Sequence, residues 1–526
     1  MPAPLARLLR APDSPSKWLT MLAVCLGLGM LMIDTFVVNV AFPAIGRDLQ
    51  ASLSTAEWTV SGYVLVLGVL PLAMGRLGDI FGRRRIYLAG LVVFISASMV
   101  SGLAPDIRTL IAARVLQGAG AAVMMPGTLS IITHAFPARQ RGLAIGVWGG
   151  VSGLGLIAGP ILGGLLVRGD QWRWIFWINA PVGVAALIMA VLFVAESRDT
   201  SAPRKVDWPG VALLAASLSL VMFGITQGND QGWASPAIVA CFVAGVAFAI
   251  AFLLVETRAP VPLVHLALFR RGTFVMACLS AFLFSAAVFG SQPYTSLFMQ
   301  NSMGFSPLQA GFAFIPSTAI VATLMPVSGM LGQRLGPRLR VVVIAGSLLV
   351  ACSFLYTLRM EPGSTYTSVL LPAFILRGMG IGLVMSATSL AVMNSAPVAM
   401  SGLASGTLTM FRQVGTALGV ALFGAVFLHH VHSAIPDATR NLPPDQSARV
   451  VAAAEHFVAA GPGDTRAEAD RIIVDGFVLV AAYGVLVTAV ATASAFFIRP
   501  RRLTPEAAEA PAPVLAGEPR RTQPAK

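Results

Sequence analysis

The stretch that decides the fold is Trp18–Phe42, which reads WLTMLAVCLGLGMLMIDTFVVNVAF. It is long enough to cross a bilayer as a helix, because about 20 apolar residues span the hydrocarbon core. Its one charged side chain is Asp34. A carboxylate at that depth costs about 2.5–3.5 kcal/mol on insertion scales, so an acid inside a membrane is a candidate functional group by default. Asp34 is therefore the first candidate site residue.

The composition extends this conclusion to the whole chain. Of its 526 residues, 56% are hydrophobic and 11% are charged, and the mean hydropathy is +0.78. A soluble domain has about 25% charged residues. We therefore expect an all-α polytopic membrane protein. The first apolar run is too long for a cleavable signal peptide, and the four cysteines have no metal-binding or CxxC spacing.

Apolar runs predict fourteen transmembrane helices, and almost no acid other than Asp34 lies at membrane depth within them. The predicted spans are 18–42, 57–75, 86–104, 109–132, 142–167, 174–195, 208–227, 235–256, 274–299, 308–332, 340–358, 367–393, 402–430 and 474–498.

The distribution of Lys and Arg between the loops predicts the orientation. On this assignment 24 of the 36 basic residues lie on the side of the N-terminus, nine lie on the other side, and three lie within spans. Cytoplasmic loops carry the excess of positive charge. The sequence therefore predicts that both termini are cytoplasmic, in the cell (cytoplasmic or inner) membrane.

The chain also repeats itself. Residues 118–164 align with residues 378–424 without a gap, and their glycines coincide, as Gly118 and Gly378 do. Both copies have their basic loops on one side, and parallel six-helix halves are a known transporter plan. We therefore expect a cytoplasmic N-terminus at 1–17, an N-terminal half at 18–195, a linker with two extra helices at 196–256, and a C-terminal half at 257–498. The last contains an external loop at 431–473, and a disordered cytoplasmic tail follows at 499–526.

Several motifs resemble the major facilitator superfamily, and in particular its fourteen-helix drug:proton antiporters. The loop Gly75–Arg85, GRLGDIFGRRR, resembles the signature loop of that superfamily, and Arg114–Gly120, RVLQGAG, resembles its proton-linked arginine motif. The segment with Ile33, Asp34 and Thr35 resembles the first-helix motif of the subfamily. The resemblance spans about residues 18–498 and implies the major facilitator fold, with two inserted helices between the halves.

Asp34 and Arg114 are the residues we assign to proton coupling. A carboxyl whose surroundings change as a cavity opens to each side could carry a proton or compete for a cationic substrate. The resemblance implies coupling by Arg114, whose guanidinium stays charged. The alternatives are a neutral Asp34 that is hydrogen-bonded to Asn39 or Thr35, and an Arg114 that only satisfies backbone carbonyls near Pro126.

Two further motifs are assigned conformational or packing roles. The resemblance implies a conformational gate at Gly75, Gly78, Asp79, Gly82, Arg83 and Arg84, although positive charge retained on the cytoplasmic side is the simpler explanation. A group of small residues in the fifth span resembles the packing motif typical of that superfamily's antiporters: Gly155, Gly159, Pro160, Gly163 and Gly164. Its small residues let helices approach closely, so it is chiefly a packing motif.

Polar and aromatic side chains near the expected cavity are the candidate substrate-binding residues: Asp34, Asn39, Trp58, Tyr63, Gln117, Gln292 and Tyr294. We expect no metal site, although His429, His430 and His432 lie close together, and we expect no cofactor. The expected partners are an amphipathic small molecule, protons and the bilayer, without nucleic acid, and a monomer suffices.

The predicted function is proton-coupled efflux of amphipathic drugs or antibiotics by alternating access. The alternative is dedicated export of one endogenous metabolite or lipid. An enzyme is not expected, since no histidine lies deep in a predicted span and no GxSxG motif occurs. A P-loop is also absent from the sequence, which argues against direct use of ATP.

Overall fold

The computed structural model describes residues 16–136, 144–198, 206–396, 401–451 and 464–498, apart from gaps at 145–146, 149–150, 152–154, 156–157, 160, 168–170, 261, 263, 265, 441, 444 and 448–449. The described residues are predominantly helical and contain no strand. Residues 1–15 of the predicted N-terminal segment and the predicted cytoplasmic tail lie outside them.

The N-terminal half contains α2 (Ser16–Asp48), α3 (Leu53–Val69), α4 (Pro71–Phe81), α5 (Arg83–Gly102), α6 (Ile107–Ala135), α8 (Trp174–Trp177) and α9 (Asn179–Phe193). The two inserted helices are α10 (Trp208–Gln231) and α11 (Pro236–Arg258). The C-terminal half contains α12 (Leu266–Phe269), α13 (Gly272–Gly290), α14 (Gln292–Asn301), α15 (Pro307–Ala313), α16 (Ile315–Leu335), η2 (Gly336–Arg338), α17 (Arg340–Thr357), η3 (Tyr366–Leu370), α18 (Leu371–Ser395), α19 (Ser401–Thr439) and α21 (Asp464–Phe496).

Twelve helical segments among the described residues are long and apolar enough to cross a membrane. The predicted second span is divided into α3 and α4, of 17 and 11 residues. The division falls at Pro71, which has no N–H to continue the hydrogen-bond ladder. Leu70 nevertheless keeps helical torsion angles of −76° and −27°, so α3 leads directly into α4. The predicted fifth span is only partly described, so the count of fourteen stays a prediction.

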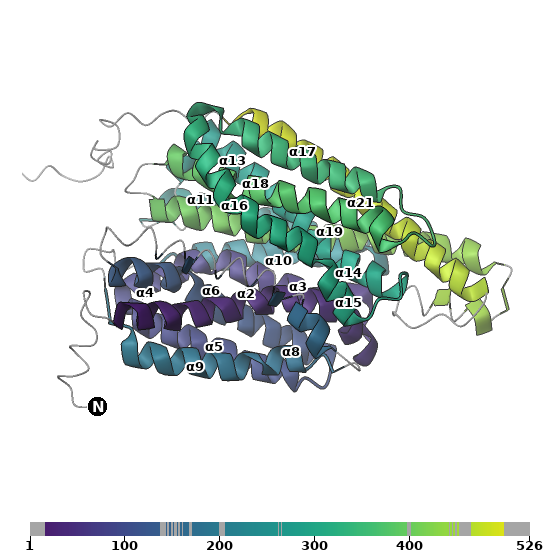
Figure 1. Cartoon of the computed structure of the whole chain (residues 1–526), viewed down its shortest axis with the longest axis horizontal. Helices are drawn as coiled ribbons and strands as arrows, with labels where there is room; N and C mark the ends of the chain where they lie inside the picture. The colour runs from purple at the N-terminus through teal and green to yellow at the C-terminus, as the bar shows by residue number, and fades with distance from the viewer. Residues whose placement is uncertain are drawn as a thin grey trace, which may run out of the picture.

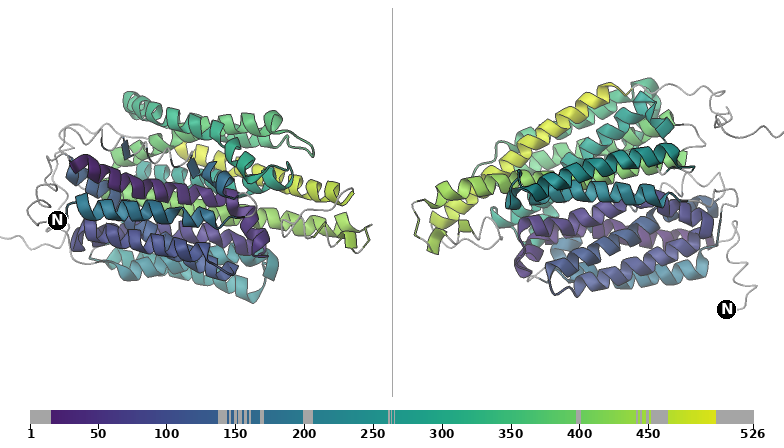
Figure 2. Two further views of the ribbon diagram at one scale, coloured as in Figure 1. Left: turned by 60° about the horizontal axis from the view of Figure 1, so that its bottom comes forward. Right: turned by 180° about the vertical axis from the view of Figure 1, so that it is seen from behind.

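The two halves lie side by side as two groups of helices (Figure 1). Helices α2, α5, α6 and α9 form one group, and α16 to α19 belong to the other. The views in Figure 2 show the same separation from two further directions. Helix α10 packs against α3 of the first half and α19 of the second, as well as against α11. The inserted pair therefore borders the contact between the halves.

Equivalent glycines make equivalent contacts in the two halves. A methyl group at Gly118 would lie 2.7 Å from the backbone oxygen of Tyr63, and one at Gly378 would lie 2.5 Å from the backbone oxygen of Ser317. Gly118 thus lets α6 approach α3 closely in the N-terminal half, and Gly378 lets α18 approach α16 closely in the C-terminal half. The internal repeat in the sequence corresponds to a repeat in helix packing.

The segment predicted as an external loop, 431–473, is partly helical. Helix α19 continues to Thr439 and α21 begins at Asp464. The extension of α19 keeps apolar contacts, because Val431 is fully buried and Ile435 packs against the core. The ends of both helices project beyond the bundle in Figures 1 and 2.

The bundle has two ends, which we name the N-terminal face and the far face. The N-terminal face contains the start of α2 and the junction of α4 with α5, and the far face contains the end of α2 and the start of α3. The halves contact each other toward the far face, where Gln300 Nε2 donates to the Val40 oxygen at 2.9 Å. Gly164 also packs there against the backbone of Pro307 and Leu308.

Candidate functional site

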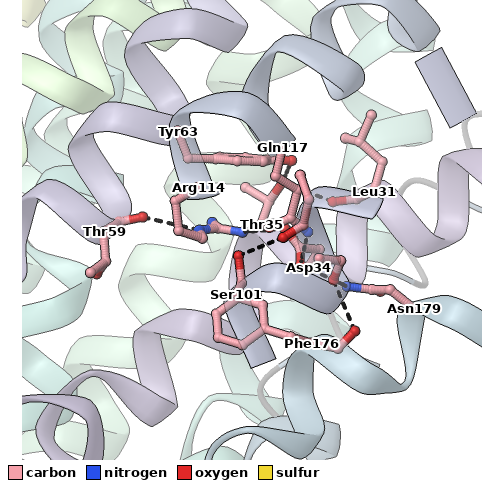
Figure 3. Close-up of polar contacts among 12 residues, drawn as sticks. Leu31, Asp34, Thr35, Thr59, Tyr63, Ser101, Arg114, Gln117, Phe176 and Asn179 are labelled. Carbon is pink, nitrogen blue, oxygen red and sulfur yellow. Dashed lines mark hydrogen bonds and ion pairs between the residues drawn. The ribbon is translucent and has the colours of Figure 1, made fainter. Parts of the chain in front are cut away.

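Asp34 and Arg114 form a buried ion pair in the N-terminal half (Figure 3). Arg114 Nη1 lies 2.7 Å from Asp34 Oδ2. The Asp34 side chain is 0% exposed and that of Arg114 is 1% exposed. Both charges have lost their hydration. A buried ion pair is therefore stable only when the two groups are well aligned and further hydrogen bonds satisfy their remaining polar atoms.

Two amides complete the surroundings of the carboxyl group. Asp34 Oδ1 accepts from Gln117 Nε2 at 2.8 Å and from Asn179 Nδ2 at 2.8 Å. Asn179 Nδ2 also donates to Ser98 Oγ at 3.0 Å. Three donors therefore converge on Asp34, and both of its carboxyl oxygens act as acceptors.

The helices hold Arg114 in one orientation. Arg114 and Gln117 are three residues apart on α6 and hence on one face of it, and Arg114 Nη1 also donates to Gln117 Oε1 at 2.8 Å. Arg114 Nε donates to the Thr59 oxygen of α3 at 3.1 Å. The Tyr63 ring lies 4.1 Å from the guanidinium carbon. The contact of Gly118 with the Tyr63 backbone brings α6 and α3 close enough for this stacking.

The start of α6 is fixed at the far face by Asp106. This N-cap residue accepts from the Thr109 backbone N–H at 2.9 Å. That bond, together with the one from the Thr109 hydroxyl, holds the pKa of the Asp106 carboxyl below its usual value. The cap satisfies donors that the first turn of a helix leaves open.

The cluster contains some of the predicted residues and excludes others. Asp34, Tyr63, Arg114 and Gln117 lie together. The partners of Asp34 are neither Asn39 nor Thr35, since Thr35 donates to the Leu31 oxygen at 2.8 Å. Asn39 is buried farther along α2, and Trp58 is half-buried against the core.

Asn179 belongs to the cluster but was not among the predicted site residues. It is the first residue of α9, directly after the break that separates α9 from α8. The sequence signal was a polar residue within the sixth apolar span, 174–195. The pattern alone does not show which face of the helix meets Asp34.

A second buried acid, Glu57, was placed at the edge of a predicted span. Because α3 begins at Leu53 and not near residue 57, Glu57 lies one turn inside the helix and is 0% exposed. Glu57 is therefore a second buried carboxyl group beside Asp34 among the described residues of the N-terminal half. Tyr294 Oη lies 2.7 Å from Glu57 Oε1 and 2.8 Å from the Val420 oxygen. Tyr294 thus contacts Glu57 and not the Asp34 cluster.

The predicted gate loop meets Glu196, which follows α9. Glu196 Oε1 accepts from the backbone N–H of Arg84 at 3.1 Å, and the backbone N–H of Arg83 donates to the Ser197 oxygen at 3.0 Å. Gly82 has φ of +115°, a value that favours glycine. Gly75 packs on Pro126 and Gly78 lies near the backbone of Arg83. The side chain of Asp79 lies outside the described part of the chain.

Three glycines of the predicted packing motif, Gly155, Gly159 and Gly163, face α2, whereas Gly164 packs against Pro307 and Leu308 of the other half. A methyl group at Gly159 would lie 2.7 Å from Phe36 Cβ, and one at Gly163 would lie 3.0 Å from the Val37 oxygen. Gly155 has no room for a side chain beside Met32. Pro160 is outside the described residues. These glycines therefore let the fifth predicted span pack against α2, the helix that carries Asp34.

Metal chemistry has no support in the described residues, which contain no group of three or more His, Cys, Asp or Glu side chains able to hold a metal ion. Gln292 lines a small cavity in the C-terminal half together with Arg377, Phe289 and Phe314. Arg377 is buried, and its Nε donates to Ser353 Oγ at 3.4 Å.

Comparisons with known proteins agree with this architecture. The family model of the Major Facilitator Superfamily matches residues 24–420. The chain is 36% identical over 450 residues to the tetracenomycin C resistance and export protein of Streptomyces glaucescens, a match that covers 83% of this chain and 82% of that protein. It is 33% identical over 434 residues to the multidrug resistance protein Stp of Mycobacterium tuberculosis, covering 80% of this chain and 79% of that one.

A solved structure with the same fold is that of a bacterial homolog of the human lysosomal transporter Spinster. The TM-score is 0.64 at 16% identity, and the match covers 92% of this chain and 98% of the other. The family match over most of the length, and the relatives above 30% identity, lead to one conclusion. The chain belongs to the Major Facilitator Superfamily, and it is a multi-pass membrane transporter.

Proposed function

We propose that this transporter is a proton-coupled antiporter that exports amphipathic drugs or antibiotics by alternating access. In this proposal the N-terminal face is cytoplasmic and the far face is external, as the distribution of basic residues predicts. The relatives support the substrate class, because their names describe antibiotic resistance, antibiotic export and multidrug resistance.

The observation that carries the proposal is the buried ion pair of Asp34 and Arg114, with its 2.7 Å contact. In the ionised form Asp34 satisfies Arg114, Gln117 and Asn179 together. Protonation of Asp34 removes the charge that Arg114 balances and turns one acceptor into a donor. The cluster must then rearrange, so the protonation state of Asp34 is linked to the packing of α2, α6 and α9.

The contacts between the halves support alternating access in this proposal. The helices α3 and α4 of the N-terminal half pack against α19 of the C-terminal half. Further contacts, such as the hydrogen bond from Gln300 to Val40, join the halves toward the far face. Transport needs a second state in which these contacts open and the N-terminal face closes. We place the proton on Asp34 when substrate has left to the outside, and on the cytoplasmic water when substrate enters.

The cavity beside Arg377 is our candidate for substrate contact in the C-terminal half. Gln292 supplies an amide, Phe289 and Phe314 supply apolar surface, and the Arg377 guanidinium supplies positive charge. Polar groups that converge on an apolar pocket are typical of small-ligand sites. We expect Arg377→Gln to raise the KM for aromatic or anionic substrates several-fold while leaving the proton-to-substrate ratio unchanged.

The test is substrate-driven proton movement in reconstituted vesicles with an imposed pH gradient. The panel contains cationic dyes, anionic aromatic antibiotics and neutral amphipathic drugs. Asp34→Asn is compared with the wild type and with Asp48→Asn, a matched control on the same helix. Asp48 pairs with Arg173 at 2.6 Å within the same half and is partly exposed.

We expect proton movement in the wild type and in Asp48→Asn, and none in Asp34→Asn. If Asp34→Asn moves protons with substrate as the wild type does, the coupling role of Asp34 is wrong. If only one compound of the panel is transported, the alternative of a dedicated exporter replaces multidrug export.

A further inference from the structure

Glu57 forms a contact between the two halves that the coupling cluster does not explain. It lies on α3 of the N-terminal half, whereas Tyr294 lies on α14 and Val420 on α19, both in the C-terminal half. All three residues are buried. The contact lies toward the far face, because Glu57 is in the second turn of α3.

Counting hydrogen atoms shows what this contact requires. Tyr294 Oη lies within hydrogen-bond distance of two oxygens, Glu57 Oε1 at 2.7 Å and the Val420 oxygen at 2.8 Å. A phenol has one hydrogen, and a backbone carbonyl has none to donate. If Tyr294 donates to Val420, the second short contact needs a hydrogen from Glu57. The geometry is therefore satisfied when Glu57 is protonated and donates to Tyr294 Oη.

The surroundings of Glu57 also favour the neutral form. Its second oxygen, Oε2, is buried without a hydrogen-bond partner among the described residues. A methyl group at Gly424 of α19 would overlap the carboxyl group, so the backbone of α19 lies directly against Glu57. A carboxylate oxygen buried without a partner costs more free energy than a neutral one.

The other titratable groups that face Glu57 do not supply a positive charge. Tyr294 faces it from α14, and Asp230 faces it from α10, where Asp230 Oδ2 accepts from Ser54 Oγ at 2.7 Å. Helix α19 presents Gly424 and the Val420 oxygen. The nearby acid adds repulsion against an ionised Glu57, in contrast to the pairing of Asp34 with Arg114.

We propose that Glu57 is a second proton-binding site, which closes the far face when it takes up a proton from the outside. Protonated Glu57 bridges the halves through Tyr294, and ionised Glu57 requires water and hence an open far face. The proton enters from the far side when that side is open and returns there when it reopens, so the site adds no net proton transfer. External acid thereby favours the state that opens to the cytoplasm. This proposal rests on the alternating access and the orientation of the proposed function.

The experiment measures closure of the far face directly, without transport. Spin labels are attached to Leu103→Cys and Glu361→Cys, which are exposed at the far face in the N-terminal and C-terminal halves, after the four native cysteines are replaced. The distance between the labels is followed by pulsed electron resonance in lipid nanodiscs as a function of pH.

In the wild type the short distance should dominate at acid pH and the long distance at alkaline pH. For one proton, the ratio of the two populations changes by at most about tenfold per pH unit. Glu57→Gln, whose amide can still donate to Tyr294, should stay closed at every pH. Tyr294→Phe keeps the ring that stacks on Phe427 but has no hydroxyl, and it should lose closure at acid pH.

Asp48→Asn is the matched control, because Asp48 is a far-face acid whose described ion pair lies within its own half. It should titrate as the wild type does. A distance that is independent of pH in the wild type, or that still titrates in Glu57→Gln, would overturn the proposal.

The two proposals fail separately. If transport is driven by protons but the distance between the spin labels does not change with pH, the role of Glu57 is rejected and the antiporter proposal stands. Closure that depends on Glu57 in a protein that moves no protons with substrate would reject the antiporter and keep the external proton site.

Discussion

Asp34 and Glu57 are both fully buried carboxyl groups, yet their surroundings make opposite demands. Asp34 accepts from Arg114, Gln117 and Asn179 within one half of the protein. Glu57 faces Tyr294, whose single hydrogen is shared with a backbone oxygen, across the contact between halves. Burial alone therefore does not decide whether an acid is charged. The hydrogen-bond donors and acceptors around a buried carboxyl group decide its charge. The following substitutions test this difference between Asp34 and Glu57.

The largest effect is expected from loss of Arg114. Arg114→Met leaves the Asp34 carboxylate buried with two amide donors and no cation. Breaking a buried ion pair by removing one partner costs about 3–5 kcal/mol. We expect a lower thermal unfolding midpoint in detergent for Arg114→Met than for the wild type.

The double variant Asp34→Asn with Arg114→Met provides the internal control, because it removes both charges. It should recover most of the lost stability. A double variant no more stable than Arg114→Met would contradict a charge-pairing role and indicate that the shape of Arg114 matters most.

The same chemical change should have different effects at the two acids. Asp34→Asn places an NH₂ group where three donors converge, which leaves buried donors unsatisfied at about 1–3 kcal/mol. Glu57→Gln keeps a donor for Tyr294 and should change the unfolding midpoint little. Thermal unfolding of the two variants in parallel measures the contrast. Equal destabilisation by the two amides would remove the distinction between the sites.

A smaller effect is expected at Gly424, which makes room for Glu57. Gly424→Ala would push a methyl group into the carboxyl, and overpacking of this kind typically costs about 1–3 kcal/mol, less where the closed contact can open. The population with a closed far face should fall in the spin-label measurement. Gly329→Ala is the control, since no atom lies within 4 Å of the added methyl group there. If Gly424→Ala leaves the population with a closed far face unchanged, the close contact between Gly424 and Glu57 is not needed for closure, which would contradict this account.

The smallest effect is expected away from both acids, at Glu196. Its carboxylate accepts from the Arg84 N–H at the start of α5. A negative charge at a helix N-terminus contributes about 0.3–1 kcal/mol. Glu196→Gln should therefore lower stability slightly and raise proteolysis of the gate loop at low salt, with less difference at high salt. Glu196 also lies 3.7 Å from Arg85 Nε, in an exposed ion pair that adds little. A loss of stability as large as that of Arg114→Met would contradict this account of Glu196.

The sequence predicted the Asp34 site better than the Glu57 site for a physical reason. A charged residue in the middle of an apolar run is visible without any structure, and so are Asp34 and Arg114. Glu57 was placed at the end of a predicted span, where an acid is ordinary, because the true start of α3 at Leu53 depends on its Ser52 cap. Its partner Tyr294 is 237 residues away in the sequence.

The internal repeat shows the same limit. The shift of 260 residues that aligns the glycines places Phe374 at the position of Arg114 and Arg377 at that of Gln117. The shared glycines predicted a shared helix arrangement, since packing depends on small residues. The polar cluster is not shared, because α13, which packs Ala286 against Gly419, has no charged residue in its sequence. Roles must therefore be read from side chains and not from the repeat.

The most direct test of the account is the protonation of the two acids, observed by infrared difference spectroscopy on the reconstituted protein at acid pH with a transported compound of the panel bound. In that state the account leaves Asp34 ionised and Glu57 protonated. The account predicts a protonated-carboxyl C=O absorption in the wild type that disappears in Glu57→Gln and persists in Asp34→Asn. The opposite result, in which the band is lost in Asp34→Asn and kept in Glu57→Gln, would contradict the assignment of both sites.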